Sequence, residues 1–275
     1  MNRKAEADEP VRVAARSALE GLYDIRDARV GLCVAGLEGP LAGVRFGLRE
    51  DEAFPSASLI KVLILGELLR QADAGRLSLG EQLLVDEDDL VEDSEMLGAR
   101  RLPAGVSLRR LAEGMITVSD NTATNLLVRR VGMGGINALA RGLGLRRTFL
   151  RREMMDFAAR ARGEENTTSA SDMVALMREV RAGSALTRPS REFALGLLLG
   201  QRLASKIPVA HPPGARYAHK TGELDGVEND AGIFVLPGRS FALAVLVEGD
   251  LGRAVEPLSE ALRVICGSFA GADGA

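Results

Sequence analysis

Hydrophobic and polar residues follow two different periods along the chain, and the period changes twice. Residues 10–23 place apolar side chains at helical spacing, and Pro10 suits a first helical turn. Two strand-like runs, 29–37 and 41–48, follow and are joined by Glu-Gly-Pro, which is typical of a hairpin. The N-terminal region is therefore expected to form a helix and two antiparallel strands.

Helical spacing then dominates to about residue 204, and strand spacing returns after the Pro-Pro-Gly at 212–214. In chain order, this pattern predicts helices over 58–73, 108–117, 120–131, 134–142, 171–182 and 190–204, strands over 215–222, 229–238 and 240–249, and a last helix over 254–269.

This order of elements predicts two lobes. Residues 1–52 and 207–275 would form an α/β lobe, in which an antiparallel five-stranded sheet is flanked by the N- and C-terminal helices. Residues 53–206 would form an inserted all-α lobe. A cleft between two such lobes is a usual place for a small-molecule site, so we expect the functional residues there.

Composition narrows the range of partners. The 275 residues are 46% hydrophobic and 27% charged, as in ordinary globular proteins, and the formal net charge is −3. This charge argues against nucleic acid as a partner, because a polyanion binder needs a basic excess. No apolar run approaches the ~20 residues that span a bilayer. We expect a monomer that acts on a small molecule.

The remaining compositional signals concern compartment and metals. The N-terminus lacks the apolar core of a signal peptide, so the chain is expected to be cytoplasmic, or periplasmic or extracellular after signal removal. Cys33 and Cys266 lie in apolar runs and are expected to be buried free thiols rather than a disulfide. With only His211 and His219 besides, no metal or other cofactor is expected. The acidic run at 86–95 is typical of a solvated loop, with the rim of a site as the alternative.

One lysine is out of place in this pattern. The helix predicted from Ser58 is apolar almost all round, yet it holds Lys61 near its start. A buried lysine is costly unless it is paired or neutral, and burial lowers its pKa. Lys61 could extend its amine to solvent along its aliphatic stem. Alternatively, the i, i+3 spacing places it beside Ser58, whose proton it could accept, while Ser56 lies off this pairing.

Two further motifs make the second interpretation the stronger one. Ser119-Asp120-Asn121 stands at a predicted helix start, where a helix cap is the simpler explanation. Lys220-Thr221-Gly222 stands on a predicted strand, where Lys220 could be an edge charge. The three motifs together, in this order, favour a shared site.

With "FPSASLIKVLIL", "MITVSDNTATNLL" and "HKTGELDGVENDAGIF", the sequence resembles the penicillin-recognising serine hydrolases, and most of all the class A β-lactamases. The resemblance covers nearly the whole chain and implies a β-lactamase/transpeptidase-like fold. It implies that Ser58 attacks the β-lactam carbonyl to form an acyl-enzyme, with Lys61 as its proton partner. Ser119 would relay a proton toward the leaving nitrogen.

The same resemblance assigns the substrate-binding residues. Asn121 would hold the acyl side chain of the substrate, and Asp120 would support its loop internally. Lys220 and Thr221 would bind the substrate carboxylate, and Gly222 would let its strand approach the site closely. The backbone N–H groups of Ser58 and Glu223 would form the oxyanion hole.

One loop departs from the class A pattern. That pattern has Glu-x-x-x-Asn, whose two side chains position the water that hydrolyses the acyl-enzyme. Glu153 fits the start of this loop and 166–168 fits its end, but Phe157 replaces the Asn and Met154 the usual Pro. Glu153 would then be the deacylating base with a differently held water, with Asp156 as the next candidate. If Glu153 points to solvent, the acyl-enzyme would stay trapped.

Two other residues need separate expectations. The carboxylate of Glu223 would repel an anionic substrate unless it pairs with an arginine such as Arg216 or points away. A Ser-His-Asp triad is disfavoured, because His219 and Lys220 should face opposite sides of one strand. The sequence therefore predicts a serine hydrolase of the class A β-lactamase type. A D,D-peptidase, a small-ester hydrolase and a slow-turnover penicillin-binding sensor are the alternatives, and an inactive relative is the least favoured.

Overall fold

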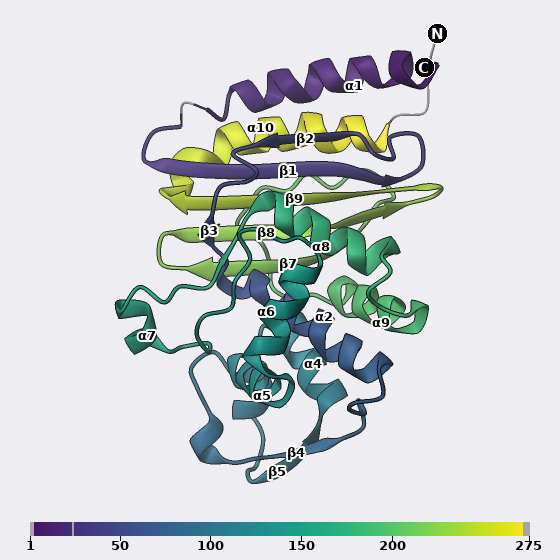
Figure 1. Cartoon of the computed structure of the whole chain (residues 1–275). Coiled ribbons are helices and arrows are strands. Elements are labelled where there is room, and N and C mark those ends of the chain that lie inside the picture. The colour runs from purple at the N-terminus through teal and green to yellow at the C-terminus, as the bar shows by residue number, and fades with distance from the viewer. Residues whose placement is uncertain (1–2, 24, 272–275) are drawn as a thin grey trace.

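A five-stranded antiparallel sheet forms the centre of one part of the molecule, in the order β2-β1-β9-β8-β7 (Figure 1). The computed structural model describes residues 3–23 and 25–271. The strands are β1 (Ala28–Glu38), β2 (Arg45–Leu48), β7 (Arg216–Leu224), β8 (Val227–Leu236) and β9 (Arg239–Gly249). The sheet confirms the predicted fold class and joins the two ends of the sequence through the β1–β9 pairing.

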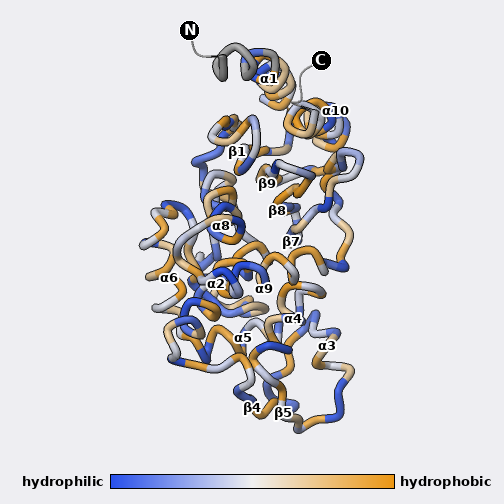
Figure 2. The backbone as a smooth tube through the Cα atoms, turned by 90° about the vertical axis from the view of Figure 1, so that its right-hand side faces the viewer, coloured by the Kyte–Doolittle hydropathy of each residue, from blue (hydrophilic) through white to orange (hydrophobic). Residues whose placement is uncertain are grey.

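Helices cover both faces of this sheet, because apolar residues occupy both faces of its central strands. Along β1, Val30 and Val34 contribute to the core beneath α1 (Arg3–Glu20) and α10 (Leu251–Ala270). Cys33 and Ala35, which alternate with them, belong to the other core, on the side of α8 (Ala170–Ala182). Figure 2 shows the sheet between α8 and α10, with α1 beside α10.

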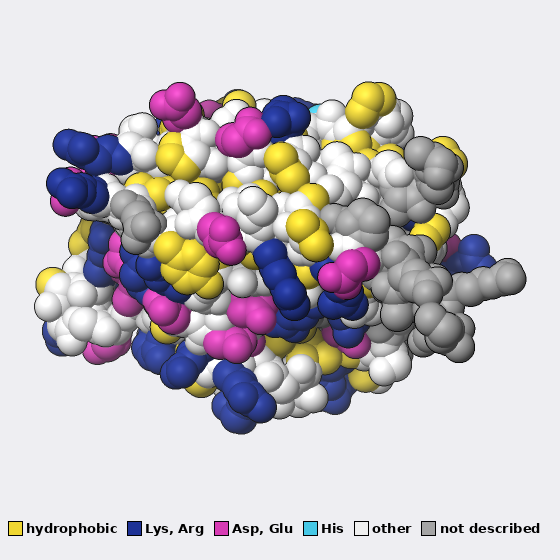
Figure 3. All heavy atoms as spheres, turned by 90° about the horizontal axis from the view of Figure 1, so that it is seen from above, with side chains coloured by type: hydrophobic (Ala, Val, Ile, Leu, Met, Phe, Trp, Pro, Cys, Tyr) yellow, Lys and Arg dark blue, Asp and Glu magenta, His cyan; other side chains and the backbone are white. Residues whose placement is uncertain are grey.

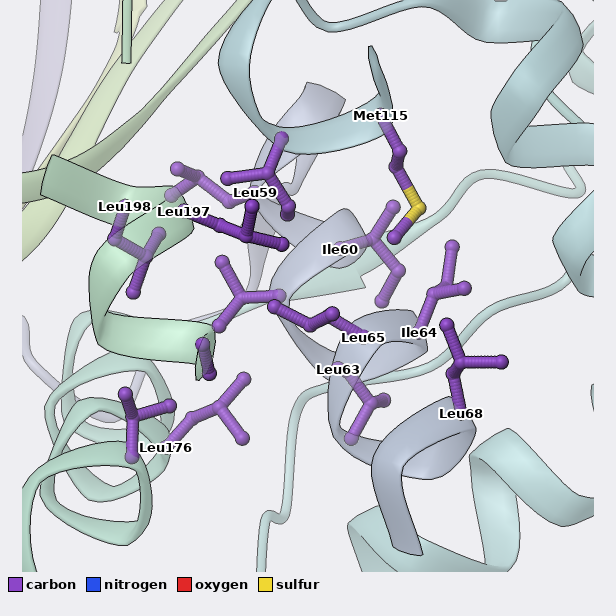
Figure 4. Close-up of a cluster of buried hydrophobic side chains, with 14 of the residues drawn as sticks. Leu59, Ile60, Leu63, Ile64, Leu65, Leu68, Met115, Leu176, Leu197 and Leu198 are labelled. Carbon is purple, nitrogen blue, oxygen red and sulfur yellow. The ribbon is translucent and has the colours of Figure 1, made fainter. Parts of the chain in front are cut away.

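The helical part is built around α2 (Ile60–Asp73), in which every residue from Ile60 to Leu69 is buried. Its apolar side chains meet those of the surrounding helices in one cluster (Figure 4). This continuous burial agrees with a sequence that is apolar all round. The surrounding helices are α4 (Leu108–Thr117), α5 (Asn121–Val131), α6 (Met133–Gly142), α8 and α9 (Arg188–Leu199).

The structure differs from the predicted elements mainly at ends and in short segments. Ser58 lies in the 3₁₀ turn η1 (Ala57–Leu59), so α2 begins at Ile60 rather than at Ser58. The sequence pattern also missed several elements of two to five residues, which are too short to show a period. These are β3 (Phe54–Pro55), β4 (Gln82–Val85), η2 (Glu87–Asp89), α3 (Glu95–Gly98), β5 (Ala104–Ser107), α7 (Phe157–Ala161) and β6 (Thr167–Thr168).

The two cysteines are free and buried, as predicted. Cys33 belongs to the core on the α8 side of the sheet and Cys266 to the core on the α10 side, so the sheet separates them. Burial raises the pKa of Cys266 to about 12 and that of Cys33 further, which keeps both thiols protonated and unreactive.

The terminal helices α1 and α10 lie together at one end of the molecule (Figure 1). Figure 3 looks down on this end of the molecule, where basic and acidic side chains are interspersed. In the described part of the chain, no helix is long and apolar enough to cross a membrane. Within the same residues, no group of three or more His, Cys, Asp or Glu could hold a metal ion.

Candidate active site

A cavity of about 570 Å³ is lined by residues of β7 and of the helical part. Figure 1 shows β7 at the edge of the sheet that faces the helical part. The walls of the cavity come from η1, the loop before α5, the β7–β8 hairpin and the segment from residue 152 to 166. Among the residues that line it are Ser58, Ser119, Asn121, Thr221 and Glu223. The three sequence motifs, which are 61 and 101 positions apart, therefore meet at one cavity.

Ser58 is presented by a tightly supported turn. Ala57, just before it, has left-handed backbone geometry with φ of 45°, which is unfavourable for a residue with a Cβ. Gly222 lies against this turn, and a Cβ at that position would stand 3.2 Å from Ser58 N. Its neighbour on β8, Asn229, donates from Nδ2 to Pro55 O at 2.9 Å and to Ser56 O at 3.3 Å. Strands β7 and β8 thus fix the position of the turn that carries Ser58.

The hydroxyl of Ser119 links the other polar groups. Its Oγ accepts from Lys61 Nζ at 2.9 Å and from Lys220 Nζ at 3.1 Å, and it donates to Ser58 Oγ at 2.9 Å. A hydroxyl has one proton and two lone pairs, so these three contacts use its full capacity. Ser119 has φ of 59°, a left-handed conformation that holds the hydroxyl between the three groups.

Lys61 contacts Ser58 only through Ser119, which corrects the direct contact expected from the i, i+3 spacing. Its Nζ donates to Ser119 O at 2.7 Å, to Ser119 Oγ and to Asn121 Oδ1 at 2.7 Å. No hydrogen bond joins it to Ser58 in the described part of the chain. Three acceptors from the loop before α5 and from the first residue of α5 occupy the amine instead.

The Lys61 side chain is fully buried and does not reach solvent. Burial, aided by the nearby charge of Lys220, holds the pKa of Lys61 well below its usual value, against the opposing influence of Asp120 and Asp93. Lowering the pKa of a lysine increases the fraction of its amine that is neutral, the form that can accept a proton.

Lys220 is also fully buried, so the interpretation as an edge charge is wrong. Burial lowers the pKa of Lys220 to about 7, although the carboxylate of Asp230 opposes the shift. Its Nζ donates to Thr221 O at 3.0 Å as well as to Ser119 Oγ. Lys220 and Lys61 are thus two desolvated amines that share one hydroxyl.

Asp120 holds the loop that carries Ser119. Its Oδ1 accepts from Ala123 N at 2.8 Å, which caps α5, and its Oδ2 accepts from the backbone N–H groups of Met96 and Leu97, both at 3.0 Å. One buried carboxylate thereby ties the starts of α3 and α5 together. Asn121, the next residue, donates from Nδ2 to Glu92 O at 3.2 Å.

Glu153 lies outside the residues that line the cavity, contrary to the expectation of a base beside Ser58. Its two carboxylate oxygens accept from Arg129 Nε at 2.9 Å and Nη2 at 2.8 Å, and the same arginine reaches Asp89 at 3.1 Å. Asp156, the next candidate, also does not line the cavity and instead accepts from Ala159 N at 2.8 Å at the start of α7.

Met154 lines the cavity in place of Glu153. Asn125 fixes its backbone on both sides, because Met154 N donates to Asn125 Oδ1 at 2.7 Å and Asn125 Nδ2 donates to Met154 O at 3.0 Å. The loop therefore places Met154, an apolar residue of the adjoining core, at the cavity wall where a carboxylate was expected. Sequence reasoning missed Asn125 and Asn229, since an asparagine in a helix or strand carries no signal of a distant backbone contact.

Two other expectations are settled by the geometry. His219 Nδ1 lies 3.1 Å from Asp230 Oδ1, and Tyr217 donates to the same carboxylate at 2.8 Å. This trio does not line the cavity that contains Ser58, so it does not form a triad with it. Glu223 pairs with Lys206 rather than with Arg216, and Lys206 also reaches Glu228 at 2.9 Å.

The chain is similar to known proteins over almost its full length. The family model described as "Beta-lactamase enzyme family" matches residues 15–265. "Beta-lactamase AER-1" from Aeromonas hydrophila is 30% identical over 198 residues, which cover 71% of this chain and 64% of that protein. The chain thus spans a little under two thirds of the length of that relative.

Solved structures show the same fold. "Structure of PBP-A" superposes with a TM-score of 0.83 at 28% identity, covering 94% of this chain and 96% of that one. A point mutant of PBP-A, in an acyl-enzyme complex with penicillin-G, gives 0.84 at 27% identity over 94% and 97%. A β-lactamase from Sphaerobacter thermophilus gives 0.79 at 25% identity over 96% and 98%.

Proposed function

Because the chain belongs to the β-lactamase enzyme family, we propose that it is a serine hydrolase that opens β-lactam rings through an acyl-enzyme at Ser58. The observation that carries this proposal is the hydrogen-bond network in which Ser119 joins Ser58 to two buried lysines. Such a network supplies a nucleophile, a base and a proton path without a cofactor.

In the acylation step, Ser58 Oγ attacks the lactam carbonyl carbon. Neutral Lys61 has two N–H bonds, which can serve Ser119 O and Asn121 Oδ1, so its lone pair is free to face Ser119 Oγ at 2.9 Å. The Ser119 hydroxyl turns its proton to this lone pair, and the Ser58 proton passes to Ser119 Oγ as the Ser119 proton moves to Lys61 Nζ. When the C–N bond breaks, the proton returns through Ser119 to the leaving nitrogen. Positioned proton transfer of this kind typically contributes ~10²–10⁴ in rate.

The surrounding residues bind the substrate in this proposal. The ammonium of Lys220 and the hydroxyl of Thr221 attract the substrate carboxylate, and Asn121 takes the amide of the acyl side chain. The backbone N–H groups of Ser58 and Glu223 stabilise the developing oxyanion, an effect for which one donor is typically worth ~10²–10³ in rate. Gly222 supports this arrangement, since any larger residue would push β7 away from Ser58 N.

Deacylation is proposed to be slow, because Met154 lines the cavity while Glu153 is bound to Arg129. With its carboxylate held by Arg129, Glu153 does not activate water beside the ester, and the acyl-enzyme persists. This observation favours a second candidate function, that of a penicillin-binding protein of the D,D-peptidase or sensor type. The likeness to PBP-A, one mutant of which was captured as an acyl-enzyme with penicillin-G, supports this second candidate.

Intact-mass spectrometry with benzylpenicillin tests both statements. We expect an adduct of one penicillin mass per chain that persists for many minutes, and no adduct in Ser58→Ala. An adduct on Ser58→Ala would refute the assignment of the nucleophile. An adduct that disappears within seconds would show that a deacylating base operates despite the position of Glu153.

A further inference from the structure

The cavity around Ser58 is lined by carboxylates. Six acidic residues line it against two basic ones, Arg152 and Arg160. The cavity itself is identified by Ser58 and the lysine network, which do not depend on these carboxylates. The acidic lining residues are Asp93, Glu95, Glu165, Glu223, Asp225 and Glu228.

The basic side chains nearby neutralise only some of these groups. Arg152 and Arg160 both bind Glu165, at 2.7 and 3.1 Å. Lys206 is shared between Glu223 and Glu228. Among the ion pairs of the described residues, none includes Asp93, Glu95 or Asp225. Three acidic residues that have no ion pair within the described part of the chain therefore line the space that a substrate would occupy.

Asp93 is the best placed of the three. Its backbone O accepts from Asn121 N at 3.1 Å, so the two residues are fixed side by side. Its own backbone is left-handed, with φ of 54°. The charge of Asp93 also reaches Lys61, whose amine contacts Asn121 Oδ1. An acyl side chain bound at Asn121 would therefore lie next to the Asp93 carboxylate.

From this charge distribution we infer that the site prefers acyl donors whose acyl side chain carries a cationic amine and disfavours those with an anionic side chain. Asp93 is the residue that sets the preference, and Glu95 and Asp225 add to the field of the cavity. The inference rests on the proposed function, because it assumes that the acyl group is bound beside Ser58.

The expected size of the effect follows from the exposure of Asp93. One solvent-exposed ion pair typically changes a binding equilibrium by about 1.4- to 5-fold. Exchanging an ammonium for a carboxylate reverses the sign of the interaction, so the two substituents should differ by about tenfold. Salt should reduce the difference, because the charges are exposed to solvent.

Three penicillins that differ only at the α-carbon of the side chain provide the test. Benzylpenicillin has hydrogen there, ampicillin an amine and carbenicillin a carboxylate. The second-order rate constant for acylation is measured at pH 6, where the amine, with a pKa of about 8, is protonated. We expect this rate constant to be largest for ampicillin, intermediate for benzylpenicillin and smallest for carbenicillin, with about a tenfold difference between ampicillin and carbenicillin. At pH 9, where the amine is neutral, the ratio of ampicillin to benzylpenicillin should return to about 1.

Asp93→Asn and Asp89→Asn form a matched pair of variants. Both remove one negative charge, and asparagine tolerates the left-handed backbone at position 93. Asp89 is bound to Arg129 and does not line the cavity. Asp93→Asn should reduce the ampicillin-to-carbenicillin ratio by about 2- to 5-fold, while Asp89→Asn should preserve it. Because Asp93 also influences Lys61, the ratio is the informative quantity, since a change in Lys61 affects all three penicillins alike.

The outcomes separate this inference from the proposed function. Equal rates for the three penicillins, the reverse order, or equal effects of the two variants would overturn the inference and leave acylation at Ser58 standing. If none of the three forms an adduct at Ser58, the proposed function itself fails, and the inference fails with it.

Discussion

Replacing Ser119 by alanine removes the hydroxyl that joins Ser58 to the two buried lysines, the basis of the proposed proton relay. Ser119 Oγ makes three hydrogen bonds, at 2.9 Å to Lys61, 3.1 Å to Lys220 and 2.9 Å to Ser58. In Ser119→Ala, Lys61 keeps two of its three acceptors, while Lys220 keeps only Thr221 O. Each hydrogen bond lost by a charged amine is worth about 1.5–3 kcal/mol.

The kinetic consequence is larger for acylation than for binding. The proton of Ser58 loses its path to Lys61, so the acylation rate constant should fall by ~10²–10⁴. Binding of the substrate before acylation depends on Lys220, which keeps its charge and one contact, and should weaken by less than about tenfold. The expected signature is thus a loss in rate at saturation rather than in affinity.

Single-turnover acylation by a chromogenic β-lactam, followed against substrate concentration, separates the two quantities. Ser205→Ala is the matched control, because Ser205 also lines the cavity but its hydroxyl accepts from Ile207 N, away from the lysines. A Ser119→Ala variant that retains more than a tenth of the saturating rate would refute the relay and imply a direct transfer from Ser58 to Lys61.

Three further variants test the deacylation loop, the buried lysine and the support of the serine. Glu153→Gln should leave the lifetime of the acyl-enzyme unchanged, because Arg129 already binds that carboxylate, whereas Met154→Glu should shorten the lifetime at least tenfold. Mass spectrometry after removal of free penicillin measures both lifetimes. The opposite pattern would show that Glu153 is the base. Lys220→Met should raise the free energy of unfolding in urea by a few kcal/mol at pH 6 and by less at pH 10. The reason is that the pKa of Lys220 is about 7 in the folded protein and has its ordinary, higher value in the unfolded chain. The buried charge of Lys220 therefore destabilises the fold fully below pH 7, and the destabilisation decreases as the pH rises toward the unfolded pKa. An equal effect of the substitution at both pH values would contradict this. Asn229→Ala should slow acylation about tenfold while leaving substrate affinity within about threefold, since it releases Pro55 O and Ser56 O beneath the serine; a change in affinity alone would exclude this positioning role.

The sequence predicted the long periodic elements well and the irregular ones poorly, for a physical reason. Strand β1 and helix α2 bury their side chains with a regular period, and that period is visible in the sequence. The side chain of Glu153 follows no such rule. Its direction depends on Arg129 and Asn125, which lie 24 and 29 positions from the residues they hold.

The same distinction applies within the active site. The types of residue at Ser58, Lys61, Ser119 and Lys220 could be identified because they recur as short motifs. Their connection could not, because the left-handed Ser119 places its hydroxyl between groups that the i, i+3 rule would have joined directly. Local spacing predicts neighbours within one helix, whereas the acceptors of the Lys61 amine come from Ser119 and Asn121, which are 58 and 60 positions away in the sequence.

The left-handed residues at the cavity also set a limit on how stable this protein can become. Ala57, Asp93, Ser119 and Met155 all adopt positive φ without being glycine, and all four line the cavity. Each conformation typically costs of order 1–3 kcal/mol, so these four residues lower the stability of the fold. Substitution by glycine would relieve that strain and at the same time let the wall sample other shapes. A lineage of this protein adapting to heat is therefore expected to gain stability in its helices and sheet, and to keep these four positions strained for as long as it keeps its chemistry.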